Sequence, residues 1–164
     1  MKIIKHLNTV NKHRYLVCKY CFKLGLYYQG LIHDLSKYSF VEFYNGCKYY
    51  QGYRSPIDKE REVKGYSAAW LHHKRNMHHI IYWFDLGKPV IIPKKYVKEM
   101  VCDRIAAATV YKGKDFLPSD PLNYFLSTKE KDNMHPESRE LLTNYLEIIA
   151  ELGINKGLKK IKSI

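Results

Sequence analysis

The chain has 164 residues, a length that fits one domain and hardly two. Hydrophobic residues make up 46% of it and charged residues 27%, which excludes a disordered segment and is typical of a chain that buries a core. The apolar run at residues 79–84 is far too short to cross a bilayer, and polar residues interrupt any signal-like segment near the N-terminus. We therefore expect a soluble, cytoplasmic protein without a membrane partner.

The chain is strongly basic. Lysine and arginine number 28 against 16 acidic residues, for a net charge of +12. Such a surplus favours anionic partners, such as nucleotides, nucleic acid or phosphorylated metabolites. The lysines are scattered without a long basic run, so a well-solvated surface explains the charge about equally well.

The four cysteines do not form a zinc signature, which would need a second pair beside CKYC at residues 18–21. We expect Cys18 and Cys21 to lie one helical turn apart as free, buried thiols, as in a reducing cytosol.

The first part of the chain is predicted to be helical from the spacing of its apolar residues. We predict a first helix from Asn8 or Asn11 to about Leu24. A second helix is expected over residues 29–37, either continuing or restarting through residues 40–50.

The middle of the chain has a more broken pattern. Residues 51–65 contain glycine, proline and mixed charge, which predicts a loop or a short helix. A third helix is expected over residues 66–74. Asn76 and Met77 can break or bend it, and the helix is then predicted to continue from His78, with Gly87 and Pro89 closing it.

The last part contains the clearest helices. A proline opens a predicted helix over residues 93–114, which places Asp103 on an otherwise apolar face. Residues 115–125 are expected to form an irregular connection. An apolar stripe predicts a helix over residues 136–152 with a glycine as its stop, followed by a short amphipathic helix or a frayed tail. The predicted fold class is all-α.

Histidines and aspartates recur along the chain in or beside these predicted helices. Imidazole nitrogens and carboxylate oxygens suit first-row metals such as iron, manganese, cobalt, nickel and zinc. One aspartate can bridge two cations, and histidines from separate helices can complete each coordination sphere. The pattern therefore predicts a binuclear metal site inside a helical bundle, with these candidate ligands: His13, His33, Asp34, His72, His73, His78, His79 and Asp103.

Each candidate also has a purely structural interpretation. The four histidines between residues 72 and 79 could form a solvated polar face, since on one continuous helix His78 would point away from the others. A break at Asn76 would instead let both pairs converge. Asp103 could form a salt bridge with a neighbouring cation, because an unpaired buried carboxylate is costly. We expect His6 and His135 to be surface residues.

The order of these residues resembles that of the HD-domain superfamily of metal-dependent phosphohydrolases, in particular its binuclear branch. LIHDLSKYS, at residues 31–39, is similar to the His-Asp-x-x-Lys element of that superfamily. A closer resemblance is to a poorly characterised bacterial and phage family with a Trp-Leu-His-His-Lys…Asn-x-His-His…Tyr-Trp run. The likeness covers about residues 13–153. It implies a single HD-domain-like helical bundle over residues 1–164, with a core at about 6–113 and a C-terminal helical extension at about 114–164.

Carried over position by position, the resemblance implies a role for each candidate. The first metal would be held by His13, His33, Asp34 and Asp103, with Asp34 bridging. The second metal would be held by one or both of His72 and His73, together with His78 and His79. Lys37 would stabilise charge on the substrate phosphate, and the catalytic set would be Lys37, Asp34 and Asp103. Lys37 would also bind substrate, together with Lys74, Arg75 and Asn76.

The sequence departs from both relatives after the His-His pair. It lacks the Gly-Tyr-Pro signature of the cyclic-di-nucleotide branch. It also has Ile80 and Ile81 where the closer family is expected to carry an acidic residue. The pattern therefore offers no carboxylate partner for His78 or His79 at this place.

The implied activity is hydrolysis of a nucleotide or another small phosphate ester, with two divalent transition-metal ions activating a water. Two other functions stay open. One is an HD-type di-iron oxygenase that cleaves C–C or C–P bonds with O2. The other is a non-enzymatic helical module that binds nucleic acid or a protein partner. The apolar stripe of the last helix is compatible with a monomer or a homodimer.

Overall fold

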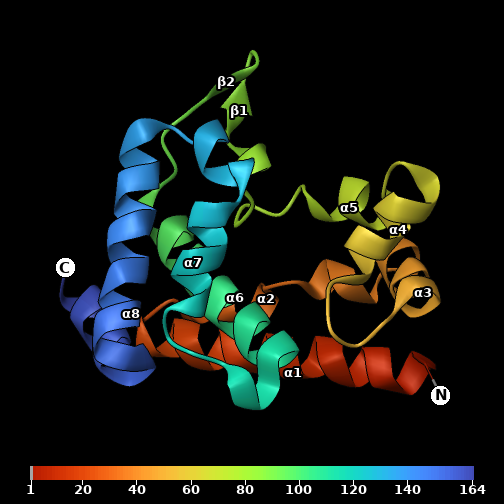
Figure 1. Cartoon of the computed structure of the whole chain (residues 1–164). Helices are drawn as coiled ribbons and strands as arrows, with labels where there is room; N and C mark the ends of the chain where they lie inside the picture. The colour runs from red at the N-terminus through yellow and green to blue at the C-terminus, as the bar shows by residue number, and fades with distance from the viewer. Residues whose placement is uncertain (1) are drawn as a thin grey trace.

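Eight α-helices and one two-stranded hairpin are formed by residues 2–164, the part of the chain that this computed structural model describes (Figure 1). Met1, the first residue of the predicted domain, lies outside the described residues. The predicted all-α fold class is confirmed. Within residues 2–164, no helix is both long and apolar enough to cross a membrane.

Helix α1 (Lys2–Lys23) begins well before the predicted start at Asn8 or Asn11. Its buried face includes His6, Val10, His13 and Val17, which recur every three or four residues. The expectation that His6 is a surface residue is therefore wrong. His6 is 7% exposed, and its ring packs 5.6 Å from those of Phe43 and Tyr50.

The helix predicted over residues 29–37 is interrupted. Helix α2 (Tyr27–Ile32) ends before His33, a 3₁₀ turn covers Leu35–Tyr38, and α3 (Phe40–Tyr49) then begins. The restart is explained by Ser39, whose hydroxyl accepts a hydrogen bond from the Glu42 amide and so caps α3. The alternative in which the helix restarts is thus the correct one.

Two short helices follow. Helix α4 (Pro56–Lys64) confirms the short-helix alternative for residues 51–65, and it is capped by the hydroxyl of Ser55. Helix α5 (Ala68–His73) confirms the third predicted helix. Its cap is Ser67, whose hydroxyl accepts from the Trp70 amide at 3.0 Å. Caps of this kind satisfy amides that the first helical turn leaves unpaired.

The predicted continuation of this helix from His78 to a stop at Gly87 and Pro89 is wrong. The chain leaves the helix after His73 and forms a turn, a 3₁₀ segment at Ile80–Tyr82, and a hairpin of β1 (Phe84–Asp85) and β2 (Lys88–Pro89). Gly87, at φ 76°, adopts a left-handed conformation that suits a hairpin turn and stops a helix. In Figure 1 the hairpin projects from the body of the molecule.

The C-terminal half contains three further helices. Helix α6 (Lys94–Lys112) confirms the helix expected after Pro93. The connection predicted as irregular after it contains α7 (Asp120–Ser127), whose start is stabilised because the Asp120 carboxylate accepts a hydrogen bond from the Leu117 amide at 2.7 Å. Two 3₁₀ turns, at Gly113–Asp115 and Lys129–Asn133, flank α7.

Helix α8 (Pro136–Ser163) is two helices joined at Gly153, whose φ of 74° and ψ of 168° are not helical. The predicted stop is therefore a break, and the last residues form a helix instead of a frayed tail. Leu158 and Ile161 of this final segment are fully buried. It is anchored by Lys98, whose ammonium donates to the carbonyl of Ile161 at 2.7 Å.

The main hydrophobic core lies where α1, α6 and α8 pack together. Its fully buried side chains include Val17, Val101, Ile105, Leu146 and Ile149. Helices α3, α4 and α5 pack against one another and lie on the other side of the molecule, over the N-terminal half of α1 (Figure 1). Helix α1 contacts both groups and so connects the two halves of the fold.

We predict that Gly157→Ala destabilises the protein. An exposed helical alanine would stabilise it by about 1 kcal/mol relative to glycine. At this position, however, a Cβ would lie 2.8 Å from Ile149 Cδ1 and 3.2 Å from the carbonyl oxygen of Ile148. We therefore expect a net loss of about 1–3 kcal/mol in the free energy of unfolding, measured by urea denaturation. Lys156→Ala, on the exposed side of the same segment, is the control. A gain in stability for Gly157→Ala would show that the tail does not pack here.

Candidate metal centre

The site begins at the interruption between α2 and the following 3₁₀ turn. His33 has extended backbone angles, and Asp34 adopts the left-handed conformation with φ 55° and ψ 25°. A residue other than glycine in this region is uncommon and needs support from its surroundings. Arg14 of α1 provides some of it, since its guanidinium donates to the carbonyls of His33 and Leu31 at 2.8 and 3.1 Å. The break lets two consecutive side chains point to one place.

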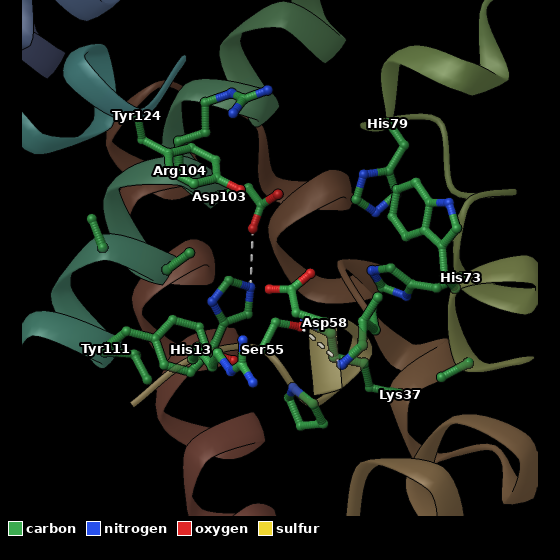
Figure 2. Close-up of a pocket in the computed structure, with 18 of the residues that line it drawn as sticks. His13, Lys37, Ser55, Asp58, His73, His79, Asp103, Arg104, Tyr111 and Tyr124 are labelled. Carbon is green, nitrogen blue, oxygen red and sulfur yellow. Dashed lines mark hydrogen bonds and ion pairs between the residues drawn. The ribbon is translucent and has the colours of Figure 1, made fainter. Parts of the chain in front are cut away.

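A first group of donor atoms surrounds one oxygen of Asp34. Asp34 Oδ2 lies 3.3 Å from Nε2 of His13 and 3.4 Å from Nε2 of His33. Asp103 of α6 completes the group, with Oδ1 3.1 Å from His13 Nε2 (Figure 2). The four residues offer atoms that all lie within 4.8 Å of one another, a spacing that could hold one cation.

A second group surrounds the other oxygen of the same carboxylate. Asp34 Oδ1 lies 3.4 Å from Nε2 of His73 and 3.2 Å from Nε2 of His78. His79 is the fourth member. The two histidine pairs converge because α5 ends at His73 and the chain turns through residues 74–79, as the predicted break allowed. Asp34 is therefore the one residue that belongs to both groups.

Most of the donor atoms have no hydrogen-bond partner. Leaving buried polar atoms without partners is costly, whereas a cation in each group would satisfy them. Nitrogen and oxygen donors in this mixture fit first-row divalent metals. Among residues 2–164, the buried donor atoms without a hydrogen bond include Nε2 of His13, His33, His78 and His79 and Oδ1 of Asp34, whereas Oδ2 of Asp34 faces the ammonium of Lys37 at 2.6 Å.

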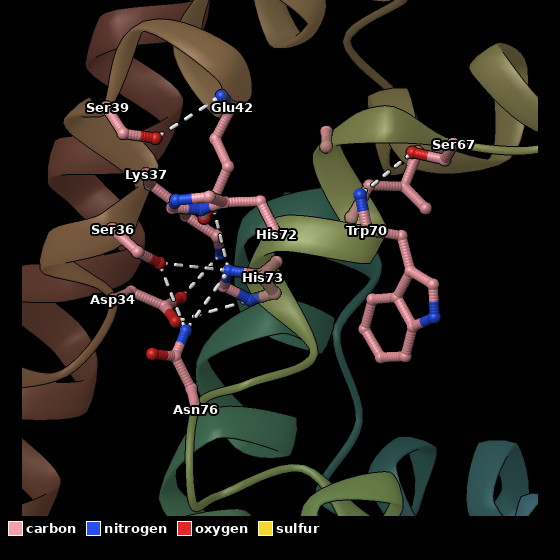
Figure 3. A network of polar contacts seen from close by, with 12 residues as sticks. Asp34, Ser36, Lys37, Ser39, Glu42, Ser67, Trp70, His72, His73 and Asn76 are labelled. Carbon is pink, nitrogen blue, oxygen red and sulfur yellow. Dashed lines mark hydrogen bonds and ion pairs between the residues drawn. The ribbon is translucent and has the colours of Figure 1, made fainter.

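Two buried glutamates orient the imidazole rings. Oε1 of Glu99 lies 2.8 Å from His33 Nδ1 and 3.3 Å from His78 Nδ1. The two oxygens of Glu42 lie 2.6 Å from His72 Nδ1 and 2.8 Å from His73 Nδ1 (Figure 3). A carboxylate at Nδ1 fixes the ring and leaves Nε2 free to bind a metal. These glutamates supply the carboxylate partners that residues 80–81 do not.

Neither glutamate was predicted from the sequence to be a site residue. A signal was present for Glu99, which precedes Asp103 by one turn of α6 and therefore shares its face. Glu42 is the one acidic residue in an otherwise apolar and aromatic stretch at the start of α3. Neither follows from the order of the histidines, because each glutamate reaches the site from a separate helix.

Electrostatics keep both aspartates ionised. Burial would raise their pKa values, but the neighbouring imidazoles, and Lys37 in the case of Asp34, outweigh it and hold both pKa values well below the usual range. For His79, burial and the adjacent His78 and His73 lower the pKa well below its usual value. His79 is thus a neutral imidazole with a free nitrogen lone pair, the form that binds a metal.

Lys37 lies beside the shared carboxylate. Its Nζ is 2.6 Å from Asp34 Oδ2. Burial would lower the pKa of Lys37, but the carboxylates of Asp34 and Asp103 outweigh it and raise the pKa, so the side chain is an ammonium. Lys37 also lines the cavity in front of the donor groups.

A cavity of about 810 Å³ opens in front of both groups. Figure 2 shows His73 and His79 on one side of it and Asp103, Arg104, Tyr111 and Tyr124 on the other. The guanidinium of Arg104 is held by Glu130 at 2.7 Å, and its Nε has no hydrogen-bond partner among the described residues. Arg104, Tyr111 and Tyr124 were not identified from the sequence.

Four other predicted site residues are not members of the donor groups, although Asn76 Nδ2 lies 3.3 Å from Nδ1 of His73. His72 is 38% exposed and belongs to neither group described within residues 2–164; its contact is with Glu42. Lys74, Arg75 and Asn76 lie in the turn after α5 and are not among the described residues that line the cavity. Asn76 instead donates to the hydroxyl of Ser36 at 3.0 Å (Figure 3). A substrate-binding role for these three residues stays a prediction.

Comparison with known proteins gives one family. The model of a family described as "Family of unknown function (DUF5662)" matches residues 2–148. This range contains every donor residue and both orienting glutamates. No curated protein and no solved structure matches the chain.

The adjacent histidines of α5 provide a matched test of the second donor group. We predict that His73→Gln lowers the metal content of the purified protein by about one ion per chain, because it removes a donor at Asp34 Oδ1. His72→Gln should leave the metal content unchanged, although it alters a contact with the same glutamate. Metal is measured by mass spectrometry of protein purified without chelators. Equal losses in both variants would contradict this assignment.

Proposed function

We propose that this chain, which belongs to the DUF5662 family, is a metal-dependent phosphohydrolase acting on a nucleotide or another small phosphate ester. One observation carries the proposal. The buried Asp34 carboxylate presents each of its oxygens to a different group of imidazoles, and members of both groups line a cavity that Lys37 also lines. The two groups would hold two divalent ions, drawn from iron, manganese, cobalt, nickel and zinc.

Bound cations would activate a water and neutralise the phosphoryl oxygens. The protein residues would position and neutralise the substrate. Lys37, held as an ammonium beside Asp34, would stabilise the additional negative charge that develops as phosphorus is attacked. Asp103 has a 21% exposed side chain, whereas that of Asp34 is 1% exposed. Asp103 therefore reaches the cavity, where its ionised carboxylate would accept a hydrogen bond from a water or a substrate hydroxyl while its Oδ1 faces His13.

The cavity is large enough for a substrate with a substantial organic part. Its volume of about 810 Å³ lies within the range of about 300–1,000 Å³ of small-molecule sites, and a phosphate group would fill little of it. Trp70, Tyr111 and Tyr124 offer aromatic surface along the cavity, which suits a nucleobase. Arg104, with its unpaired Nε, offers a charged hydrogen-bond donor for a polar group of the substrate.

The decisive experiment pairs metal content with phosphate release. Protein purified without chelators should contain about two ions per chain and release phosphate from a member of a panel of nucleoside monophosphates, cyclic di-nucleotides and generic phosphodiesters. Asp34→Asn should lose bound metal and hydrolysis together, because it removes the shared carboxylate. Asparagine tolerates a left-handed backbone, so the fold should persist, as circular dichroism would show.

Asp115→Asn, an exposed carboxylate outside the site, is the control and should keep both properties. Three results would contradict the proposal. The first is the absence of bound metal from the wild-type protein. The second is O2 consumption by the reduced iron form without phosphate release, which would indicate a di-iron oxygenase. The third is salt-sensitive binding of nucleic acid without hydrolysis by metal-loaded protein, which would indicate a binding module.

Arg104→Gln tests the position of the substrate. We predict that it raises KM for the best substrate of the panel about tenfold, because a charged hydrogen-bond donor typically contributes on the order of 1.5–3 kcal/mol. Metal content and kcat should change less than about threefold, since Arg104 belongs to neither donor group. Arg139→Gln, an exposed residue of α8, is the matched control. An unchanged KM for Arg104→Gln would place the substrate elsewhere in the cavity.

A further inference from the structure

Glu99 contacts one imidazole of each of the two donor groups. Its Oε1 contacts Nδ1 of His33, a member of the first group, at 2.8 Å. The same oxygen contacts Nδ1 of His78, a member of the second group, at 3.3 Å. The Glu99 side chain is 5% exposed, so water competes little for these contacts. One carboxylate oxygen therefore orients one imidazole of each group.

The two imidazoles are also connected at their other nitrogens. His33 Nε2 lies 3.4 Å from Asp34 Oδ2, and His78 Nε2 lies 3.2 Å from Asp34 Oδ1. Their ring centroids are 4.1 Å apart. The two rings thus lie side by side between Asp34 and Glu99, and the four residues form a closed loop. Because the loop is buried and tightly packed, one ring cannot rotate without disturbing the other.

Glu42 provides a contrasting case. Its two oxygens contact His72 and His73, of which only His73 belongs to a donor group, the second. Glu42 therefore supports one group alone, whereas Glu99 supports both. The two glutamates have the same chemistry and are similarly buried, since Glu42 as a whole residue is 5% exposed and Glu99 is 4% exposed. They form a natural pair for comparison.

We infer that Glu99 is a positioning residue that couples the two metal sites, so that filling one site raises the affinity of the other. The inference rests on the proposed function only in requiring a cation at each donor group. A hydrogen bond from Nδ1 to Glu99 fixes the tautomer in which Nε2 is free. Once a cation fixes His33, Glu99 is held with it, and ordering His78 for the second cation then costs less conformational entropy.

The test is a titration of metal-free protein with Mn²⁺ by calorimetry, combined with electron paramagnetic resonance. Wild-type protein should bind two ions with positive cooperativity, so that spin-coupled Mn²⁺ pairs form while less than one ion per chain has been added. Glu99→Gln, which keeps the size of the side chain, should weaken both sites by about 10- to 100-fold and abolish the cooperativity. At the same loading its spectrum should show isolated ions instead of pairs.

Glu42→Gln should weaken one site by at least about tenfold and leave the other unchanged. Thermal unfolding of each metal-free variant shows whether it is folded. The inference is overturned if the Glu99→Gln substitution weakens one site only, or if this variant binds two ions as the wild-type protein does. It is likewise overturned if the two sites of the wild-type protein fill independently. Glu99, His33 and His78 also form a group that could hold a cation, so the loss of a third ion from Glu99→Gln with two ions left intact would equally overturn the inference. Wild-type protein that binds none of Fe²⁺, Mn²⁺, Co²⁺, Ni²⁺ and Zn²⁺ would instead overturn the proposed function itself, and this inference with it.

Discussion

The buried carboxylate of Asp34 is the constraint on which the rest of the structure depends. It is 2% exposed, on a left-handed backbone, and its oxygens lie within 3.4 Å of imidazole nitrogens of His13, His33, His73 and His78. An ionised carboxylate without partners is very costly to bury. Residues from α1, from α5 and from the turn after α5 therefore converge on it, together with Lys37. The same convergence gathers imidazole nitrogens around each oxygen of Asp34, in two groups that could each hold a cation.

The helices that build the hydrophobic core also hold the site. Helix α6 carries Glu99 and Asp103 one turn apart, and it buries Val101 and Ile105 against the core. Helix α1 carries His13 between Val10 and Val17 of its buried face. Donor residues on elements this rigid keep their geometry better than residues on loops. The histidines of the second group lie at the end of a short helix and in a turn, and their support comes from the buried glutamates.

Several local features were predictable because they depend on near neighbours in the chain. The helix after Pro93 and the interruption at Gly153 follow from proline and glycine, and the break after α5 was expected from Asn76, a residue type that disfavours helix interiors. The errors have a common cause. His6 and the start of α1 were misplaced because polar residues hid a buried stripe. Residues 78–93 kept an apolar pattern although a hairpin forms there, since short apolar runs do not distinguish helix from strand.

The sequence by itself determined the all-α class and the ordered set of histidines and aspartates that a metal site would need. It could not choose between His72 and His73, which are adjacent in the chain and differ only in the direction of their side chains. Only the tertiary structure decided that Asp34 faces both groups, that Glu42 and Glu99 orient the rings, and that Arg104 lines the cavity. The physical reason is that local residue patterns set the backbone, whereas contacts between residues far apart in the chain are set by how the helices pack.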